Sequence, residues 1–163
     1  MKKNRRLISI VAALAIGLCI HVSSAWAEGG SPAKVVKDFA KAHFMLDASM
    51  AAYLSKDARF NEDEVDMVDF YLETKAFEAY NQGYKMSYLK MRPTVMKIKV
   101  LSMDDSSAKI QFDAITLRSI NPLYGIVGVI FGLLEEHEVQ DIITVVKEDG
   151  EWKIGPGAFD LSI

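Results

Sequence analysis

Three polar side chains of this sequence have the chemistry to bind a ligand or move a proton: His43, Tyr88 and Asp141. The unperturbed pKa of histidine lies near neutrality, so His43 is a candidate general base or hydrogen-bonding group. Asp141 shares one face of an alternating strand with Val139 and Ile143, where a carboxylate is costly unless it is paired or used. We therefore predict a ligand-binding site formed by His43, Tyr88 and Asp141, and we assign no catalytic residue.

A structural interpretation stays open for two of these residues. His43 falls on the inward side of a predicted helix, near Phe39 and Leu46, where a histidine with a backbone partner at the edge of the core has the same pattern. Asp141 falls near the start of its strand, where a carboxylate is solvated at the open end of a curved sheet.

The run Glu135-Glu136-His137-Glu138 contains side chains that ligate metal ions. On a strand, Glu135 and His137 would share one face and Glu136 and Glu138 the other, so a site would need a further ligand from elsewhere. We interpret the run as a charged strand start that blocks edge pairing, and we predict no metal site and no cofactor. No nucleophile-elbow, P-loop or dinucleotide motif occurs, so nothing in the sequence supports a nucleophilic hydrolase or a nucleotide-binding protein.

Helices are predicted in the first half of the chain. Ser31 and Pro32 form a helix start, as N-cap and first helical residue. The helix that follows has an apolar face at helical spacing, made by Val35, Phe39, Ala42 and Leu46. Asp47 is expected to cap a short second helix over 48–54.

A third helix is expected to run from Asn61 to about Asn81. Asn61 and Glu64 form a capping-box variant at its start, and Gly83 lies where a C-terminal glycine cap belongs. Its predicted apolar stripe consists of Val65, Val68, Leu72, Ala76 and Ala79.

After Gly83 the apolar period changes from helical to alternating. Strands are expected over 84–88, 96–100, 110–117, 139–145 and 152–154. The apolar phase flips after Ala114, which predicts a β-bulge in that strand. Trp152 and Ile154 are expected to face the core and to pack on the third helix.

The first 27 residues have the pattern of a signal peptide. Four basic residues precede an apolar run over 7–20 and an Ala25-Trp26-Ala27 cleavage motif. We predict a signal peptide over 1–27 and one domain over 28–163, exported to the periplasm or cell envelope. Cleavage there also removes Cys19, whose bulky neighbour Leu18 does not fit a lipoprotein site.

Because the leader holds four of the 19 basic residues and none of the 22 acidic ones, the rest of the chain carries a net charge of −7. This negative charge argues against nucleic-acid binding.

The stretch 120–134, INPLYGIVGVIFGLL, is uncharged and lies at a strand connection. Three interpretations stay open: closure of a pocket, an exposed surface for self-association or a protein partner, and peripheral membrane contact. The stretch is too short to span a bilayer. Six of its side chains form the predicted interaction surface: Leu123, Tyr124, Ile126, Val129, Ile130 and Phe131.

The segments SPAKVVKDFAKAHF, DASMAAYLSKDA and VVKEDGEWKI, with helices first and strands after them, resemble the nuclear-transport-factor-2-like superfamily. The closest resemblance is to its small exported bacterial members of unknown function. It implies an α+β fold in which N-terminal helices pack on a curved antiparallel sheet, giving a cone with a pocket between sheet and helices. Because the superfamily includes enzymes, binding modules and assembly domains, the resemblance assigns no activity.

We expect a non-catalytic role, in which the exported domain binds a small apolar ligand or a protein partner, a second copy of itself included. One alternative is an isomerase or dehydratase in which Asp141 and His43 transfer a proton, as the resemblance to ketosteroid-isomerase-like members suggests. Another is a subunit of an envelope complex that docks through 120–134. Convergence of Asp141 and His43 on one concavity would favour the enzyme, and their separation would favour binding or assembly.

Overall fold

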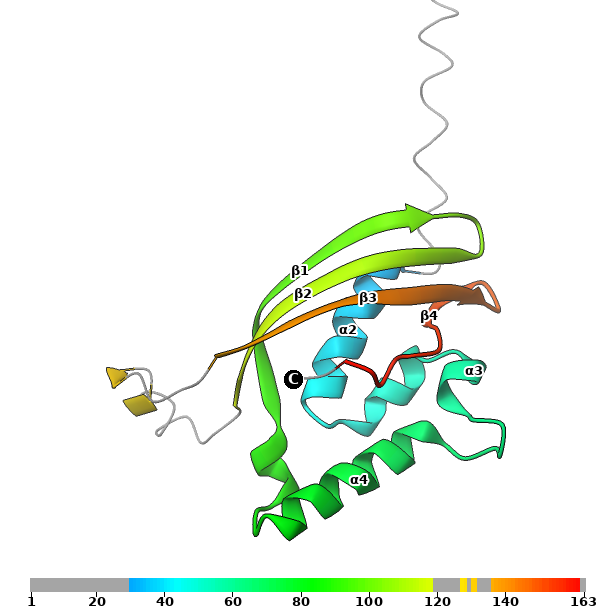
Figure 1. The fold of residues 1–163 in the computed structure, drawn as a ribbon. Helices are drawn as coiled ribbons and strands as arrows, with labels where there is room; N and C mark the ends of the chain where they lie inside the picture. Colours follow the sequence, from blue (N-terminus) through cyan, green and yellow to red (C-terminus); the bar gives the residue numbers. More distant parts are fainter. Residues whose placement is uncertain (1–29, 119–126, 129, 132–135, 162–163) are drawn as a thin grey trace, which may run out of the picture. The chain divides into compact units, whose positions relative to one another are not determined.

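The computed structural model describes residues 30–118, 127–128, 130–131 and 136–161, which form helical elements followed by an antiparallel sheet (Figure 1). The α-helices and 3₁₀ helices (η) are α2 (Pro32–Phe44), η1 (Ala48–Tyr53), α3 (Lys56–Arg59), α4 (Met67–Asn81) and η2 (Met86–Leu89). The strands are β1 (Met91–Met103), β2 (Ser107–Arg118), β3 (Glu136–Glu148) and β4 (Glu151–Ile154), paired in that order. The predicted α+β class is confirmed. The predicted signal peptide lies outside the described residues.

Helix α2 begins where the sequence predicts. The Ser31 hydroxyl accepts a hydrogen bond from the Lys34 N–H at 3.2 Å, and Pro32 occupies the first turn. Buried residues recur along α2 at three- and four-residue spacing. They include Val36, Phe39, Ala40, His43 and Phe44. The three long strands curve around this helix, and every strand of the sheet contacts it (Figure 1). The core therefore lies between α2 and the inner face of the sheet.

Strand β2 keeps one alternation along its whole length. Its buried residues on the inner face are Ala108, Ile110, Phe112, Ala114 and Thr116. Because β2 pairs with β3 without a register shift, the predicted bulge after Ala114 is wrong. The register shifts lie in β1, between Pro93 and Val95 and again between Val100 and Ser102, where bulges bend a sheet.

Helix α4 begins later than predicted. Glu64 has a φ of 60°, which interrupts the helix, and Asn61 caps only the preceding turn, accepting the Val65 N–H at 2.9 Å. The true cap is Asp66, whose Oδ1 accepts the Val68 N–H at 2.9 Å. The predicted apolar stripe is also wrong in part, because only Val68 and Ala79 of α4 are buried while Val65 is exposed. The main contacts of α4 are with η1, α3 and η2.

The chain after α4 turns before it extends. Gly83 caps the helix with a φ of 75°, as predicted, and the Tyr84 N–H donates to the Ala79 carbonyl at 2.8 Å. Residues 86–89 form η2, not the predicted strand, because the Tyr88 N–H bonds locally to the Lys85 carbonyl at 2.8 Å. Pro93 lies near the start of β1, an edge strand of this sheet, where its missing N–H is tolerated.

Strand β4 packs on α2 and η1, so the predicted packing of 152–154 on the third helix is wrong. The Ser55 N–H donates to the Ile154 carbonyl at 2.9 Å, and Leu54 bridges to Ile154, so the chain around η1 takes the place expected for the long helix. Ile154 is fully buried, as predicted. Trp152 is only half-buried, with the Lys147 ammonium 5.7 Å from its ring.

Candidate functional site

A cavity of about 450 Å³ lies among α2, α4, the ends of β1 to β3 and the C-terminal segment. We call it the inner cavity. Its volume is in the range of small-molecule pockets. Rings and aliphatic side chains make most of its wall: His43, Phe44, Leu46, Tyr71, Leu89, Met91, Phe159 and Leu161. Its charged or polar lining residues are Lys75, Glu78, Arg118, His137 and Asp160.

His43 forms the buried floor of the inner cavity. It has no solvent exposure, and its ring stacks on Tyr71 with centroids 4.9 Å apart. Burial lowers its pKa to about 4; the backbone of Leu161 opposes this shift and the charge of Lys75 adds to it. The imidazole is therefore neutral at neutral pH. Its Nε2 lies 3.4 Å from the Tyr71 hydroxyl, while Nδ1 makes no well-formed hydrogen bond within the described residues.

Helix α4 supplies the opposite wall. Tyr71, Lys75 and Glu78 are spaced by four and three residues, which places them on one face of the helix. The Lys75 ammonium pairs with Glu78 at 2.8 Å. Burial, with a smaller contribution from the Glu78 charge, raises the pKa of Tyr71 to about 12. Tyr71 is therefore a neutral phenol, and this wall carries no net charge.

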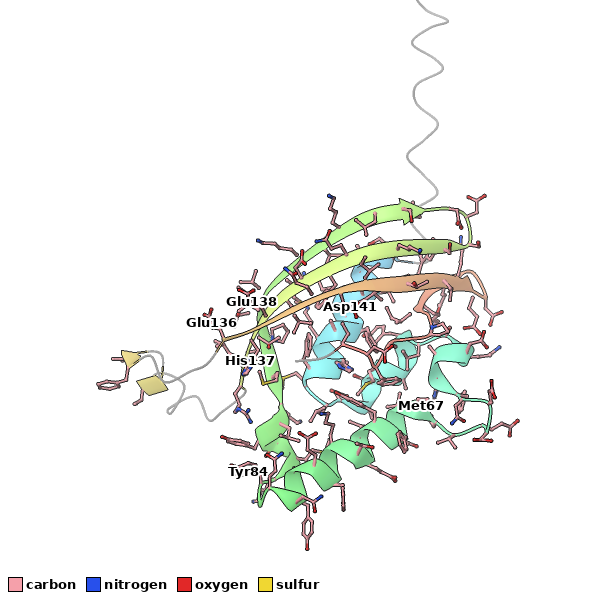
Figure 2. All side chains as sticks on the ribbon, viewed as in Figure 1. Met67, Tyr84, Glu136, His137, Glu138 and Asp141 are labelled. Carbon is pink, nitrogen blue, oxygen red and sulfur yellow. The ribbon has the colours of Figure 1, made fainter. Side chains whose placement is uncertain are left out.

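The strand ends supply the third wall. Arg118 is the register partner of Met91, and His137 is the partner of Thr116, so these side chains share the inner face. Figure 2 labels His137 and its sequence neighbours Glu136 and Glu138 at the start of β3. Both glutamates are exposed, whereas His137 is half-buried. In the described part of the chain, no three His, Cys, Asp or Glu side chains form a metal-binding group.

The three predicted ligand-binding residues do not share the inner cavity. His43 lines it. Tyr88 does not, but its ring lies 4.4 Å beneath the guanidinium of Arg118, which does. Asp141 (Figure 2) is half-buried and lines a different cavity of about 230 Å³, beside Ile154 and the loop that follows it. The Oδ1 atom of Asp141 accepts the N–H of Ile142 at 2.7 Å.

Two of the six predicted interaction residues are described. Ile130 is 71% exposed and Phe131 is 70% exposed. The other four, Leu123, Tyr124, Ile126 and Val129, lie outside the described residues. Among the described residues, no helix is long and apolar enough to cross a membrane.

The sequence interpretation missed Arg118 and Tyr71 for identifiable reasons. The predicted phase flip after Ala114 directed Thr116 and Arg118 outward, whereas the unbroken alternation of β2 directs them inward. A simple period-two extrapolation from Phe112 would have placed Arg118 on the inner face. Tyr71 was missed because the predicted apolar stripe passes through Leu72 and Ala76, beside the helix face that carries Tyr71 and Lys75.

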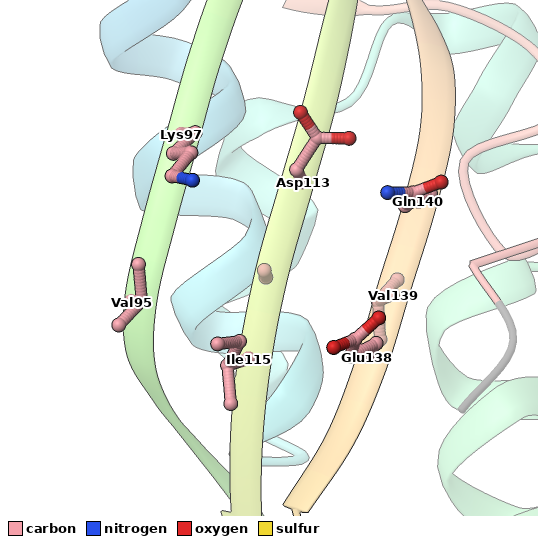
Figure 3. Close-up of a pocket in the computed structure, with 8 residues that line it drawn as sticks. Val95, Lys97, Asp113, Ile115, Glu138, Val139 and Gln140 are labelled. Atoms are coloured by element: carbon pink, nitrogen blue, oxygen red, sulfur yellow. The ribbon is translucent and has the colours of Figure 1, made fainter.

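A smaller hollow of about 140 Å³ lies on the outer face of the sheet (Figure 3). Two cross-strand rows form it. One consists of Lys97, Asp113 and Gln140, and the other of Val95, Ile115 and Glu138. Its size is below that of ordinary small-molecule pockets. We therefore take the inner cavity as the candidate site.

No family model matches the sequence, and no curated protein matches it either. Several solved structures are similar. The association domain of C. elegans CaMKII is 13% identical with a TM-score of 0.47, covering 74% of this chain and 85% of that one. A nuclear-transport-factor-2-like protein with a cystatin-like fold from Novosphingobium aromaticivorans is 9% identical with a TM-score of 0.46, covering 94% and 86%. A candidate ketosteroid isomerase from Shewanella frigidimarina is 19% identical with a TM-score of 0.41, covering 76% and 90%.

These similarities do not resolve a function, because the similar structures include both an association domain and a candidate isomerase. The fold rests on the elements of the chain itself, which follow the order expected from the sequence resemblance. Helices come first, and a four-stranded antiparallel sheet curves around the first described helix (Figure 1). The chain therefore has an α+β fold, with its helices and antiparallel strands in the order that the sequence resemblance implies.

Proposed function

We propose that this domain binds a small, mainly apolar molecule in the inner cavity and does not transform it. The observation that carries the proposal is the cavity itself: about 450 Å³, with a buried floor of neutral His43 and surrounding rings. Apolar walls with a few convergent polar groups are typical of small-molecule sites. The cavity offers both, since Tyr71 and Arg118 face it from different elements.

The placement of the candidate proton-transfer residues favours binding over catalysis. A general base works best when its pKa lies near the working pH, and burial holds the pKa of His43 at about 4. Asp141, its proposed partner in an isomerase or dehydratase, lines a different cavity. The enzyme alternative would therefore need the two residues to act without a common substrate position.

Native mass spectrometry of the protein purified from its own host tests this proposal, with two tryptophan variants. Leu89 is a half-buried lining residue, so Leu89→Trp should fill the inner cavity and remove a retained small molecule. Val95→Trp, in the outer hollow, is the matched control and should retain it. Thermal melts confirm that both variants fold. A ligand retained by folded Leu89→Trp and lost by Val95→Trp would contradict the proposal.

Self-association is a second candidate function, favoured by apolar side chains that the domain leaves exposed. Phe70, Phe77 and Tyr80 on α4 are 55%, 66% and 79% exposed, and contiguous exposed apolar surface often marks an interaction site. Sedimentation velocity of the protein and of Phe77→Ser tests it. We expect a smaller species for the variant at unchanged stability, because surface changes stay within about 0.5 kcal/mol. A monomer in both cases would refute this candidate.

Export to the periplasm or cell envelope is also proposed, on the leader pattern alone. The intact mass of the protein from its host should correspond to a chain that begins at Glu28. A lipid-modified species beginning at Cys19 would contradict this and would place the protein on a membrane surface. The same preparation also tests the proposed docking of an envelope complex through 120–134. Partner proteins should co-purify with the native protein and should be lost when Phe131→Asp is purified in the same way.

A further inference from the structure

We infer that the ligand of the inner cavity is a carboxylate with an apolar body, and that Arg118 binds the carboxylate group. This inference deepens the proposed binding function and rests on it. It starts from Arg118, which among the described lining residues is the strand-end side chain with a permanent positive charge.

Contacts with Tyr88 hold Arg118 in place, and none of them neutralises its charge. Its Nη1 donates to the Tyr88 carbonyl at 3.1 Å, and its guanidinium lies 4.4 Å above the Tyr88 ring. The Tyr84 ring packs against the Tyr88 ring in a tilted arrangement, with ring centroids 4.5 Å apart. These contacts fix the guanidinium through a carbonyl dipole and an aromatic face, both of which leave its charge intact. An arginine positioned in this way is pre-organised for a carboxylate, which it can bind through two parallel hydrogen bonds.

The other charges around the cavity are already satisfied or exposed. Lys75 pairs with Glu78 at 2.8 Å, whereas no carboxylate of the described residues lies within ion-pair distance of Arg118. Asp160 also lines the cavity but is exposed to solvent, so water screens its repulsion of an anion. Among the described residues that line the cavity, Arg118 is therefore the cation without a carboxylate partner, and its charge is available to a ligand.

The rest of the cavity suits the apolar body of such a ligand. The half-buried Tyr71, Leu89 and Phe159 supply accessible apolar wall, and the neutral ring of His43 lies at the buried floor. Burying a hydrocarbon against these groups is favourable in proportion to the area removed from water. A cation would instead meet the guanidinium, and a neutral molecule would leave it without a partner. The structure therefore favours an amphipathic anion over both.

Calorimetric titration with decanoate, decanol and decyltrimethylammonium separates these classes, because the three probes share a chain and differ in charge. We expect the protein to bind decanoate at least about tenfold more tightly than decanol, because one charge-assisted hydrogen-bonded pair provides a difference of that size. Decyltrimethylammonium should bind most weakly. Arg118→Met keeps the aliphatic contact with Tyr88. This variant should bind decanoate only as tightly as decanol, and its affinity for decanol should equal that of the native protein. Arg92→Met, on the same sheet but outside the cavity, is the matched control and should keep the preference.

The outcomes distinguish the inference from the function on which it rests. Equal affinity for decanoate and decanol in the native protein would overturn the carboxylate inference while the cavity proposal stands. A preference for decanoate that persists in Arg118→Met would overturn the role of Arg118. No binding of any of the three probes would overturn both proposals. Asp160→Asn provides an independent check, because removing that negative charge should increase the affinity for decanoate and leave the affinity for decanol unchanged.

Discussion

Acid should destabilise this protein more than it destabilises a variant that lacks His43. The pKa of His43 is lowered from 6.5 to about 4 because folding buries the imidazole. Below about pH 6.5 the unfolded chain takes up a proton that the folded protein does not, so the stability provided by the neutral ring is present above that pH and is lost as the pH falls toward 4. Each unit of pKa difference corresponds to about 1.4 kcal/mol. The loss attributable to His43 is therefore about 1 kcal/mol near pH 5.5 and about 3 kcal/mol near pH 4.

Urea unfolding of the native protein and of His43→Met at about pH 7, 5.5 and 4 measures this difference. Methionine is apolar and adaptable, so it fills the same buried position without titrating. Carboxylates titrate in both proteins and cancel in the comparison. The native protein should lose about 3 kcal/mol more than the variant between pH 7 and 4. Parallel losses in the two proteins would refute the reasoning and would mean that the His43 ring charges in the folded state.

Three further substitutions test the packing, each by urea unfolding. Phe112→Ala removes a fully buried ring that stacks on Phe44 at 6.2 Å, and it should cost about 3–5 kcal/mol; a cost below about 1 kcal/mol would mean that the β2 register is wrong. Trp152→Ala should cost clearly less, because its ring is half-buried; an equal cost would contradict its place at the edge of the core. Gly150→Ala should cost about 1–2 kcal/mol, since Gly150 has a φ of 86° with open space around it; no change would contradict a left-handed turn there.

The order of elements was predictable because local signals agree with it. Ser31-Pro32 and Gly83 mark helix ends through capping chemistry that needs no tertiary context. The alternation through Ile110, Phe112 and Ala114 identifies a half-buried strand in the same way. The start of α4 was not predictable, because Asn61 and Asp66 are both good caps and the positive φ of Glu64 decides between them.

The candidate site was predictable only in part. His43 falls within the helical stripe of α2, so its burial follows from spacing. Its pairing with Tyr71 depends on how α4 crosses α2, and no local pattern encodes that. Arg118 was missed because the apolar Ile115 and Leu117 suggested a bulge in β2. They in fact lie on the outer face, which is itself partly apolar, as the exposed Val95 shows.

The central claim, that the inner cavity binds an apolar molecule, is tested most directly by methyl NMR of the protein labelled at its methionine methyl groups. Met91 lines the cavity, whereas Met50 is buried elsewhere in the core and Met103 is exposed at the far end of β1. Titration with decanoate or decanol should shift the Met91 methyl signal in a saturable manner and leave Met50 and Met103 in place. A saturable shift at Met103 without one at Met91, or no shift at any of the three methyl groups at the highest soluble ligand concentration, would contradict the account.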